Sequence, residues 1–306
     1  MYYTITFNPA VDMVIQVENC QLGDLNRSSG EEYVAGGKGI NVSFILNRLG
    51  IENTATGFLG GFSGVFIQQK VLKEGVTPHF VEVDGTTRIN IKLKSDEETE
   101  INGAGPLVSK ENFQDLYRYF EERLTDEDVV FLAGNSAPGL DEEAYLAIGR
   151  LCQEKGARFV LDTNKDLLTT CLAVRPFLIK PNHHELAEIF QAPVDTEDDI
   201  VTYAKKLQDK GARHVLVSRG GDGALLLTED GEVYTSNVPK GKVINSAGAG
   251  DSMLAGFMAT YQKSKDFAES LRMGTASGSA TAFSVGIAER SLIDQLKEEI
   301  IVQRVK

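Results

Sequence analysis

The chain alternates short apolar runs with amphipathic segments over most of its length. Runs typical of buried strands cover residues 2–7, 55–59, 128–133, 158–162, 177–180 and 214–218. Apolar residues at helical spacing cover residues 40–49, 64–74, 141–155 and 196–210. Strands that alternate with helices pair in parallel and carry helices on both faces. The pattern therefore predicts one α/β domain over residues 1–306, a three-layer αβα sandwich with a mainly parallel central sheet.

One segment departs from this rhythm, because residues 87–94 alternate strictly between polar and apolar side chains. A polar turn and a return strand over 99–102 complete a predicted hairpin. An isolated hairpin is marginal, so we expect it to join the extended pieces at 12–20 and 31–34 in a small sheet. Segments of about 11–35 and 86–104 would then form a β-sheet lid, and its apolar face could pair with a second copy in a homodimer. The alternative is an edge hairpin with solvated charges.

Charge and cysteine content narrow the class of partner. The 306 residues carry a formal net charge of −13, which opposes binding to nucleic acid and to acidic membranes. The three cysteines are widely spaced, as expected for reduced thiols. No apolar run approaches the roughly 18 residues of a membrane span. We therefore expect a cytoplasmic protein that acts on a small molecule.

A glycine-rich stretch at 245–252, NSAGAGDS, precedes an apolar pattern typical of a helix that begins near Asp251. Amides at a helix N-terminus are unpaired and favour anions, so Gly248, Ala249 and Gly250 are candidates for a phosphate site. The competing interpretation is that Asp251 only caps the helix.

A second glycine-rich stretch at 35–41, AGGKGIN, also precedes a helix and contributes the cation Lys38. Flexible amides beside a lysine suit a sugar that carries a phosphate. The stretch lacks the spacing of a Walker A loop and of a dinucleotide fingerprint. A structural turn is the competing interpretation.

Three shorter motifs follow predicted strands, where an α/β sheet presents its ligands. Asp12 ends the motif NPAVD and has the acceptors for two sugar hydroxyls. In the motif KPNHHE, Asn182 has the chemistry of a helix cap, and Glu185 either completes a capping box or orders water around Mg²⁺. The turn 218–223, SRGGDG, fits a β-hairpin and offers backbone to a nucleotide.

Together, these motifs closely resemble the ribokinase-like, or PfkB, family of carbohydrate kinases over nearly the whole chain. The opening TFNPAVD, the segment TRIN at 87–90 and ETEIN at 98–102 are similar to the branch that uses phosphorylated ketohexoses. The last two segments are most similar to the bacterial 1-phosphofructokinases of that branch. The resemblance implies ATP- and Mg²⁺-dependent phosphorylation of fructose 1-phosphate at C6. The alternatives are tagatose 6-phosphate as the substrate, or a non-catalytic sugar-phosphate sensor on the same fold.

The resemblance also implies roles for individual residues. Asp251 would be the base, with the amides of Gly248, Ala249 and Gly250 as an anion hole. Residues implied to bind the sugar phosphate are Asp12, Arg27, Gly36, Gly37, Lys38, Asn41, Arg88, Asn90 and Asn135, the last at a position where the family often carries serine. Residues implied to bind ATP are Lys180, Asn182, Ser218, Gly220, Gly223, Ala247, Gly248, Gly250 and Gly278. Glu185 would hold the metal through water.

Overall fold

A ten-stranded sheet forms the centre of the molecule in the computed structural model, which describes residues 1–305. Its strand order is β14-β13-β12-β11-β10-β9-β8-β1-β4-β5. The seven strands from β11 to β5 in this order are parallel, and β12, β13 and β14 are antiparallel. The strands are β1 Tyr2–Thr6, β4 Asn53–Leu59, β5 Thr77–Glu82, β8 Val129–Ala133, β9 Arg158–Asp162, β10 Leu178–Ile179, β11 His214–Ser218, β12 Ala224–Leu227, β13 Val233–Ser236 and β14 Val302–Arg304.

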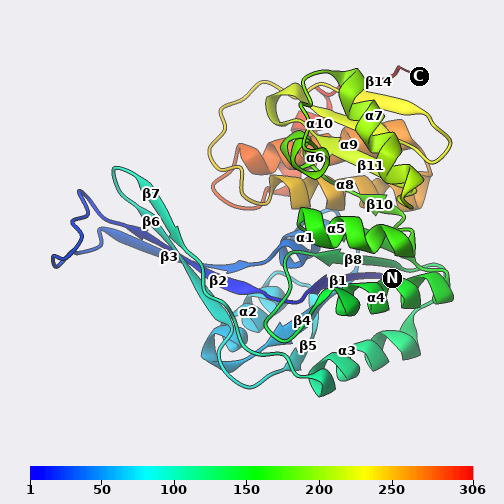
Figure 1. Ribbon diagram of the computed structural model, residues 1–306. Helices are drawn as coiled ribbons and strands as arrows, with labels where there is room; N and C mark the ends of the chain where they lie inside the picture. The colour runs from blue at the N-terminus through cyan, green and yellow to red at the C-terminus, as the bar shows by residue number, and fades with distance from the viewer. Residues whose placement is uncertain (306) are drawn as a thin grey trace.

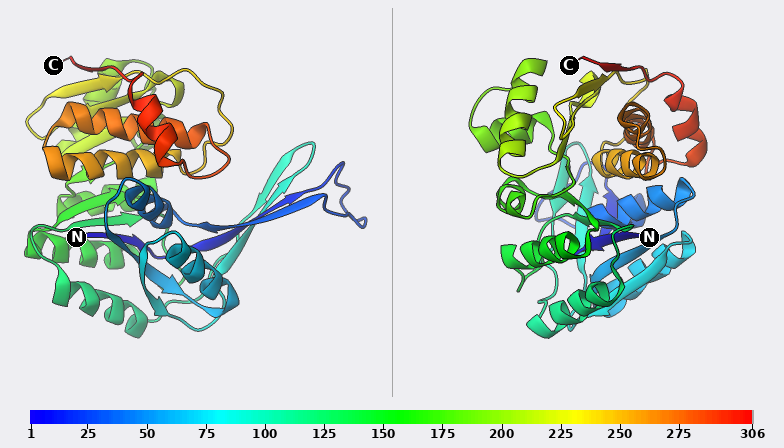
Figure 2. Two further views of the ribbon diagram at one scale, coloured as in Figure 1. Left: turned by 180° about the vertical axis from the view of Figure 1, so that it is seen from behind. Right: turned by 90° about the vertical axis from the view of Figure 1, so that its right-hand side faces the viewer.

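Helices cover both faces of this sheet, as the predicted sandwich requires (Figure 1, Figure 2). One face packs against α3 Lys110–Arg123, α4 Glu142–Lys155, α5 Lys165–Cys171, α6 His183–Phe190 and α7 Glu197–Asp209. The other packs against α1 Lys38–Arg48, α8 Ala249–Ser264, α9 Phe267–Ala282 and α10 Arg290–Lys297. Successive strand residues alternate between the two cores: Val130 and Leu132 face the first, and Val129 and Phe131 face the second. Burial on both faces explains why the strands are continuous apolar runs.

A smaller four-stranded sheet projects from this body (Figure 1). Its order is β3-β2-β6-β7, with β2 Ala10–Gln16, β3 Gly30–Gly36, β6 Arg88–Lys94 and β7 Glu98–Ile101. Helix α2 Gly61–Lys73 packs near its base. The predicted hairpin is confirmed as β6 and β7, and β6 pairs in parallel with β2, which sets Asn90 beside Asp12.

The start of α8 differs from the prediction by two residues. The helix begins at Ala249, and Gly248 is its N-cap with a left-handed φ of 78°. Only a glycine adopts this backbone without strain. Asp251 therefore lies inside the first turn and its side chain does not cap the helix.

Candidate active site

A cleft of about 430 Å³ lies where the carboxyl ends of the parallel strands meet the small sheet and the starts of α1 and α8. Two glycine-rich segments that are more than 200 residues apart in sequence meet there, because Asn41 of α1 donates a hydrogen bond of 2.8 Å to Asp251 of α8. The cleft is lined by Thr6, Asn8, Ala10, Asp12, Gly37, Lys38, Asn41, Arg88, Asn90, Gly134, Asn135, Asp162, Lys180, Asn182, Glu185, Ser218, Gly248, Gly250 and Asp251.

Asp251 is a buried carboxylate whose surroundings favour its protonated form. Burial, followed by the negative charge of Asp162, raises the pKa of Asp251 to about 6. Lys38, the Asn41 hydrogen bond and Lys180 act in the opposite direction and keep the pKa from rising further. A carboxylate in this range is ionised at neutral pH and is a stronger proton acceptor than a solvated aspartate.

The amides just before Asp251 are arranged to receive an anion. The amides of Gly248 and Gly250 have no backbone acceptor among the described residues, whereas Ala249 donates to the Ser246 carbonyl at 3.2 Å. A Cβ at position 250 would lie 2.8 Å from Lys180 Nζ, so glycine keeps the turn open beside a cation. Open amides, the helix dipole and a lysine together form an anion site.

Asp162, at the end of β9, connects two lysines. Its Oδ1 lies 2.9 Å from Lys38 Nζ and its Oδ2 lies 3.4 Å from Lys180 Nζ. Burial alone would raise the pKa of Asp162, but the charges of Lys180 and Lys38 outweigh burial and hold its pKa below the usual value. Asp162 in turn is the main cause of the raised pKa of Lys38. Lys38 therefore remains positively charged inside the cleft.

The side of the cleft next to the small sheet contains buried oxygen atoms that lack donors. Asn90 donates 2.9 Å to Asp12 Oδ1, but Asn90 Oδ1, Asn8 Oδ1 and Thr6 Oγ1 have no hydrogen-bond partner in the described structure. Buried polar atoms are usually satisfied, so these three acceptors indicate that a ligand with hydroxyl groups completes them. Arg88 lies at the rim, where it donates to the Asn8 carbonyl at 2.9 Å.

Asn182 and Glu185 form a capping box at the start of α6. The Asn182 side chain accepts from the Glu185 amide, and Glu185 Oε2 accepts from the Asn182 amide, both at 2.8 Å. The capping interpretation is therefore correct, and it does not exclude a metal, since both residues also line the cleft. Among residues 1–305, no three His, Cys, Asp or Glu side chains cluster as metal ligands. Mg²⁺ commonly keeps several waters, so one carboxylate in the cleft still suits it.

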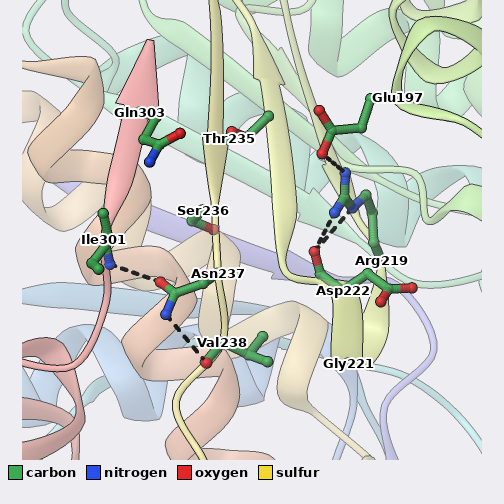
Figure 3. A pocket seen from close by; sticks show the side chains of 10 residues that line it. All are labelled: Glu197, Arg219, Gly221, Asp222, Thr235, Ser236, Asn237, Val238, Ile301 and Gln303. Atoms are coloured by element: carbon green, nitrogen blue, oxygen red, sulfur yellow. Dashed lines mark hydrogen bonds and ion pairs between the residues drawn. The ribbon is translucent and has the colours of Figure 1, made fainter. Parts of the chain in front are cut away.

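Figure 3 shows a pocket beside the turn that follows β11, and side-chain contacts hold this turn in place. Arg219 pairs with Glu197 at 2.5 Å and donates to the Asp222 carbonyl. Elsewhere in the same pocket, the Asn237 side chain donates to the Val238 carbonyl and accepts from the Ile301 amide. The turn is a hairpin between β11 and β12, as predicted. Gly223 has a structural reason to be glycine, because a Cβ there would lie 1.8 Å from the Ser236 carbonyl.

Several predicted site residues lie outside the cleft lining. Arg27 is exposed in the loop between β2 and β3. Gly278 belongs to the contact between α8 and α9, where a Cβ would approach the Ala249 carbonyl at 3.0 Å. Gly36 lies beside Asp12, with a Cβ position 2.9 Å from Asp12 Oδ2. Ala247 and Gly220 are exposed near the ends of their glycine-rich turns.

Sequence reasoning missed Asp162, Thr6 and Gly134 as cleft residues. Asp162 carried a usable signal, because it is an acidic residue directly after the apolar run 159–161 at the carboxyl end of β9. Thr6 ends β1 in the same way, but threonine is common in strands and gives no comparable signal.

The pattern of the pfkB family of carbohydrate kinases matches residues 6–294. The chain belongs to this family. A 1-phosphofructokinase of Bacillus subtilis is 46% identical over 100% of both chains, and a D-tagatose-1-phosphate kinase of Bacillus licheniformis is 40% identical over 98% of both. A solved structure of Escherichia coli phosphofructokinase-2 with substrates and products has a TM-score of 0.90, is 25% identical, and covers 97% of this chain and 98% of its own. The Arabidopsis thaliana ribokinase, with a TM-score of 0.80 at 18% identity over 97% and 98% of the chains, shares the fold.

Membership makes the protein a carbohydrate kinase, a phosphotransferase with an alcohol acceptor. The two Bacillus relatives just named support a sugar phosphate as the acceptor class. Over residues 1–305, no helix combines the length and the apolar character that a bilayer crossing requires.

Proposed function

We propose that this pfkB-family kinase transfers the γ-phosphate of ATP to the C6 hydroxyl of fructose 1-phosphate. The observation that carries the proposal is the contact between the two glycine-rich helix starts: Asp251, with the open amides of Gly248 and Gly250, faces Asn41 across one cleft. A proton acceptor and an anion site lie side by side, which is the arrangement that phosphoryl transfer to a hydroxyl requires.

In the proposed reaction, Asp251 accepts the proton of the C6 hydroxyl as that oxygen attacks the γ-phosphorus and the bond to the leaving ADP oxygen breaks. The amides of Gly248 and Gly250 and the ammonium of Lys180 stabilise charge on the transferred group. Glu185 would hold Mg²⁺ through water, and the ion would neutralise charge on the nucleotide phosphates.

The sugar would occupy the side of the cleft that contains the unsatisfied oxygen atoms. Asp12, Asn90 and Asn41 supply acceptors and donors for its hydroxyls, and the unpartnered oxygens beside them support this assignment. Lys38 and Arg88 supply positive charge for the phosphate already on the sugar. Asn135 also lines the cleft, and we retain it as a phosphate contact. We propose that Ser218 and the turn after it bind the nucleotide.

The second candidate acceptor is tagatose 1-phosphate, favoured by the relative of that name. It differs from fructose 1-phosphate only in the configuration at C4, so the same phosphate and C6 contacts serve both. The experiment is a steady-state comparison of fructose 1-phosphate, tagatose 1-phosphate and tagatose 6-phosphate with MgATP, with the product position assigned by NMR. We expect the highest kcat/KM for fructose 1-phosphate. A preference for either tagatose ester would reject our choice of sugar, and no turnover of any would favour the sensor.

We further propose that the small sheet acts as a lid over the sugar and joins two copies in a homodimer. Exposed Tyr33 on β3 and Ile101 on β7 lie in one register row of this sheet and support an apolar contact there. Light scattering during gel filtration would test it: Tyr33→Asp with Ile101→Asp should give monomers, and a monomeric wild type would exclude the dimer. A cytoplasmic location also stays a prediction, in keeping with the free Cys20, Cys152 and Cys171.

A further inference from the structure

A second cavity, of about 490 Å³, lies at the amino ends of the strands, on the opposite side of the central sheet from the cleft. It lies where β9, β10 and β11 begin, because Arg158, Phe177 and Arg213 stand at or just before the first residues of these strands. The end of α4 and Tyr261 of α8 form its sides. No step of the proposed reaction uses this cavity.

Three arginines from three separate segments converge on the cavity, with one carboxylate. Glu229 forms an ion pair with Arg213, whose Nη2 and Nε lie 2.8 and 2.9 Å from Glu229 Oε2. Its other oxygen, Oε1, lies 3.8 Å from Arg175 Nη2. Arg158 has no ion pair among residues 1–305 and instead lies over the Phe177 ring, 5.8 Å from its centroid. The cluster therefore keeps an excess of two positive charges in a protein whose net charge is −13.

One neighbouring cation, Lys265, increases this excess of positive charge. Lys265 lies over the Tyr261 ring, with Nζ 5.2 Å from the centroid. Burial lowers the pKa of Lys265, and the charge of Arg158 lowers it further. Like charges destabilise one another, and a bound anion at the arginines would reduce this repulsion.

The backbone of Arg175 provides a separate indication. Arg175 adopts the left-handed conformation, with φ 47° and ψ 59°, at the end of the short helix Leu172–Val174. Glycine or asparagine takes this conformation at lower cost, yet the position carries a long cation whose side chain is 64% exposed beside the cavity. Strain of this kind is typical of functional positions.

We propose that this cavity binds the phosphate group of a small molecule, either inorganic phosphate or a phosphate ester. The planar guanidinium group donates paired hydrogen bonds that match phosphate oxygens, and three such groups line one cavity. Tyr261 is partly exposed and packs near the buried Phe177, with ring centroids 5.3 Å apart, and it provides apolar surface for the organic part of an ester. The proposal does not depend on the reaction assigned to the cleft.

Hydrogen–deuterium exchange tests the site, because it separates the cavity from the cleft by peptide. The probes are inorganic phosphate and AMP, each titrated into the full-length wild type, with potassium chloride at equal ionic strength as the reference. We expect phosphate to slow exchange over residues 153–159 and 174–178. Arg158→Gln with Arg175→Gln should weaken this response at least about tenfold, since each charge-assisted contact contributes about that factor.

The matched control is Arg290→Gln with Arg304→Gln, which removes the same charge from other exposed positions and should keep the wild-type response. Both double variants should keep the melting temperature to within about 2 °C, because the four arginines lie at the surface. Tighter binding of AMP than of phosphate would identify an ester as the ligand, and equal binding would identify the phosphate group alone. The proposal is overturned if the two segments show no protection, if chloride gives the same effect, or if Arg158→Gln with Arg175→Gln retains it.

Discussion

The two ends of the strands in the central sheet hold their charged side chains in different surroundings: buried at the carboxyl ends and partly exposed at the amino ends. At the carboxyl ends of the strands, Asp162 and Asp251 are buried beside Lys180, and the charge state of each carboxylate depends on its neighbours. At the amino ends of the strands, Arg158 and Arg213 are partly exposed, and water stabilises their charges. Burial makes a charge costly unless it is paired, whereas a surface ion pair contributes little. Strand β9 shows the contrast directly, because it begins at the partly exposed Arg158 and ends at the buried Asp162.

The largest effect is expected from replacing Asp251, the proposed base in the cleft. Asp251→Asn keeps the shape of the side chain and removes the proton acceptor, so kcat should fall by about 10³-fold or more. Circular dichroism and sugar-phosphate binding should remain close to wild type. Asp115→Asn, an exposed substitution on α3, serves as the control and should leave kcat unchanged. An active Asp251→Asn enzyme would refute the assigned role.

The next effect compares a buried charge with an exposed one. Asp162→Asn leaves Lys38 and Lys180 without their shared carboxylate and should lower the free energy of unfolding by about 3 kcal/mol. Asp294→Asn breaks the exposed pair with Arg290 and should cost less than about 1 kcal/mol. Urea unfolding at pH 7 measures both. Similar losses of unfolding free energy for the two variants would remove the contrast between buried and exposed charges.

A buried histidine, His214, lies at the amino end of β11. Burial, followed by the charge of Arg213, lowers the pKa of His214 to about 4, and its Nδ1 accepts the Glu229 amide. The unfolded chain then binds the proton more readily than the native protein. Stability contributed by the neutral ring is complete above about pH 6.5 and is lost as the pH falls towards 4, by roughly 3 kcal/mol.

Urea unfolding between pH 7 and pH 4 tests this contribution. His214→Gln should flatten the pH dependence relative to wild type, and His184→Gln, at an exposed position, should leave it unchanged. Parallel curves for His214→Gln and the wild type would show that His214 does not carry the effect.

The smallest expected effect refines the description of the cleft. Because the pKa of Asp251 is raised to about 6, kcat/KM should fall about tenfold per pH unit below that value. Asn41→Ala removes a hydrogen bond that favours the ionised form, so the acidic limb should move upward by roughly half a unit. The position of the limb is the readout, since the absolute rate also reflects sugar contacts. An unchanged limb would separate Asn41 from the ionisation of Asp251.

The central fold was predictable because its signals are local. Strands buried on both faces are continuous apolar runs, and helices that cover them repeat at helical spacing, so β8 or α4 could be located within one or two residues. The start of α8 was less accurate, because the left-handed backbone of Gly248 lets the helix begin two residues before Asp251.

The sequence by itself determined which residue types were available: a carboxylate after a glycine-rich turn, a lysine in another, and the sandwich that holds them. Only the tertiary structure decided that Asp162 joins Lys38 to Lys180, that Arg27 lies away from the cleft, and that Arg158, Arg175 and Arg213 meet at one cavity. These contacts connect residues far apart in the chain, so no local pattern encodes them. The shifted pKa of Asp251 depends on them too, because burial and the charge of Asp162 exist only after the chain has folded.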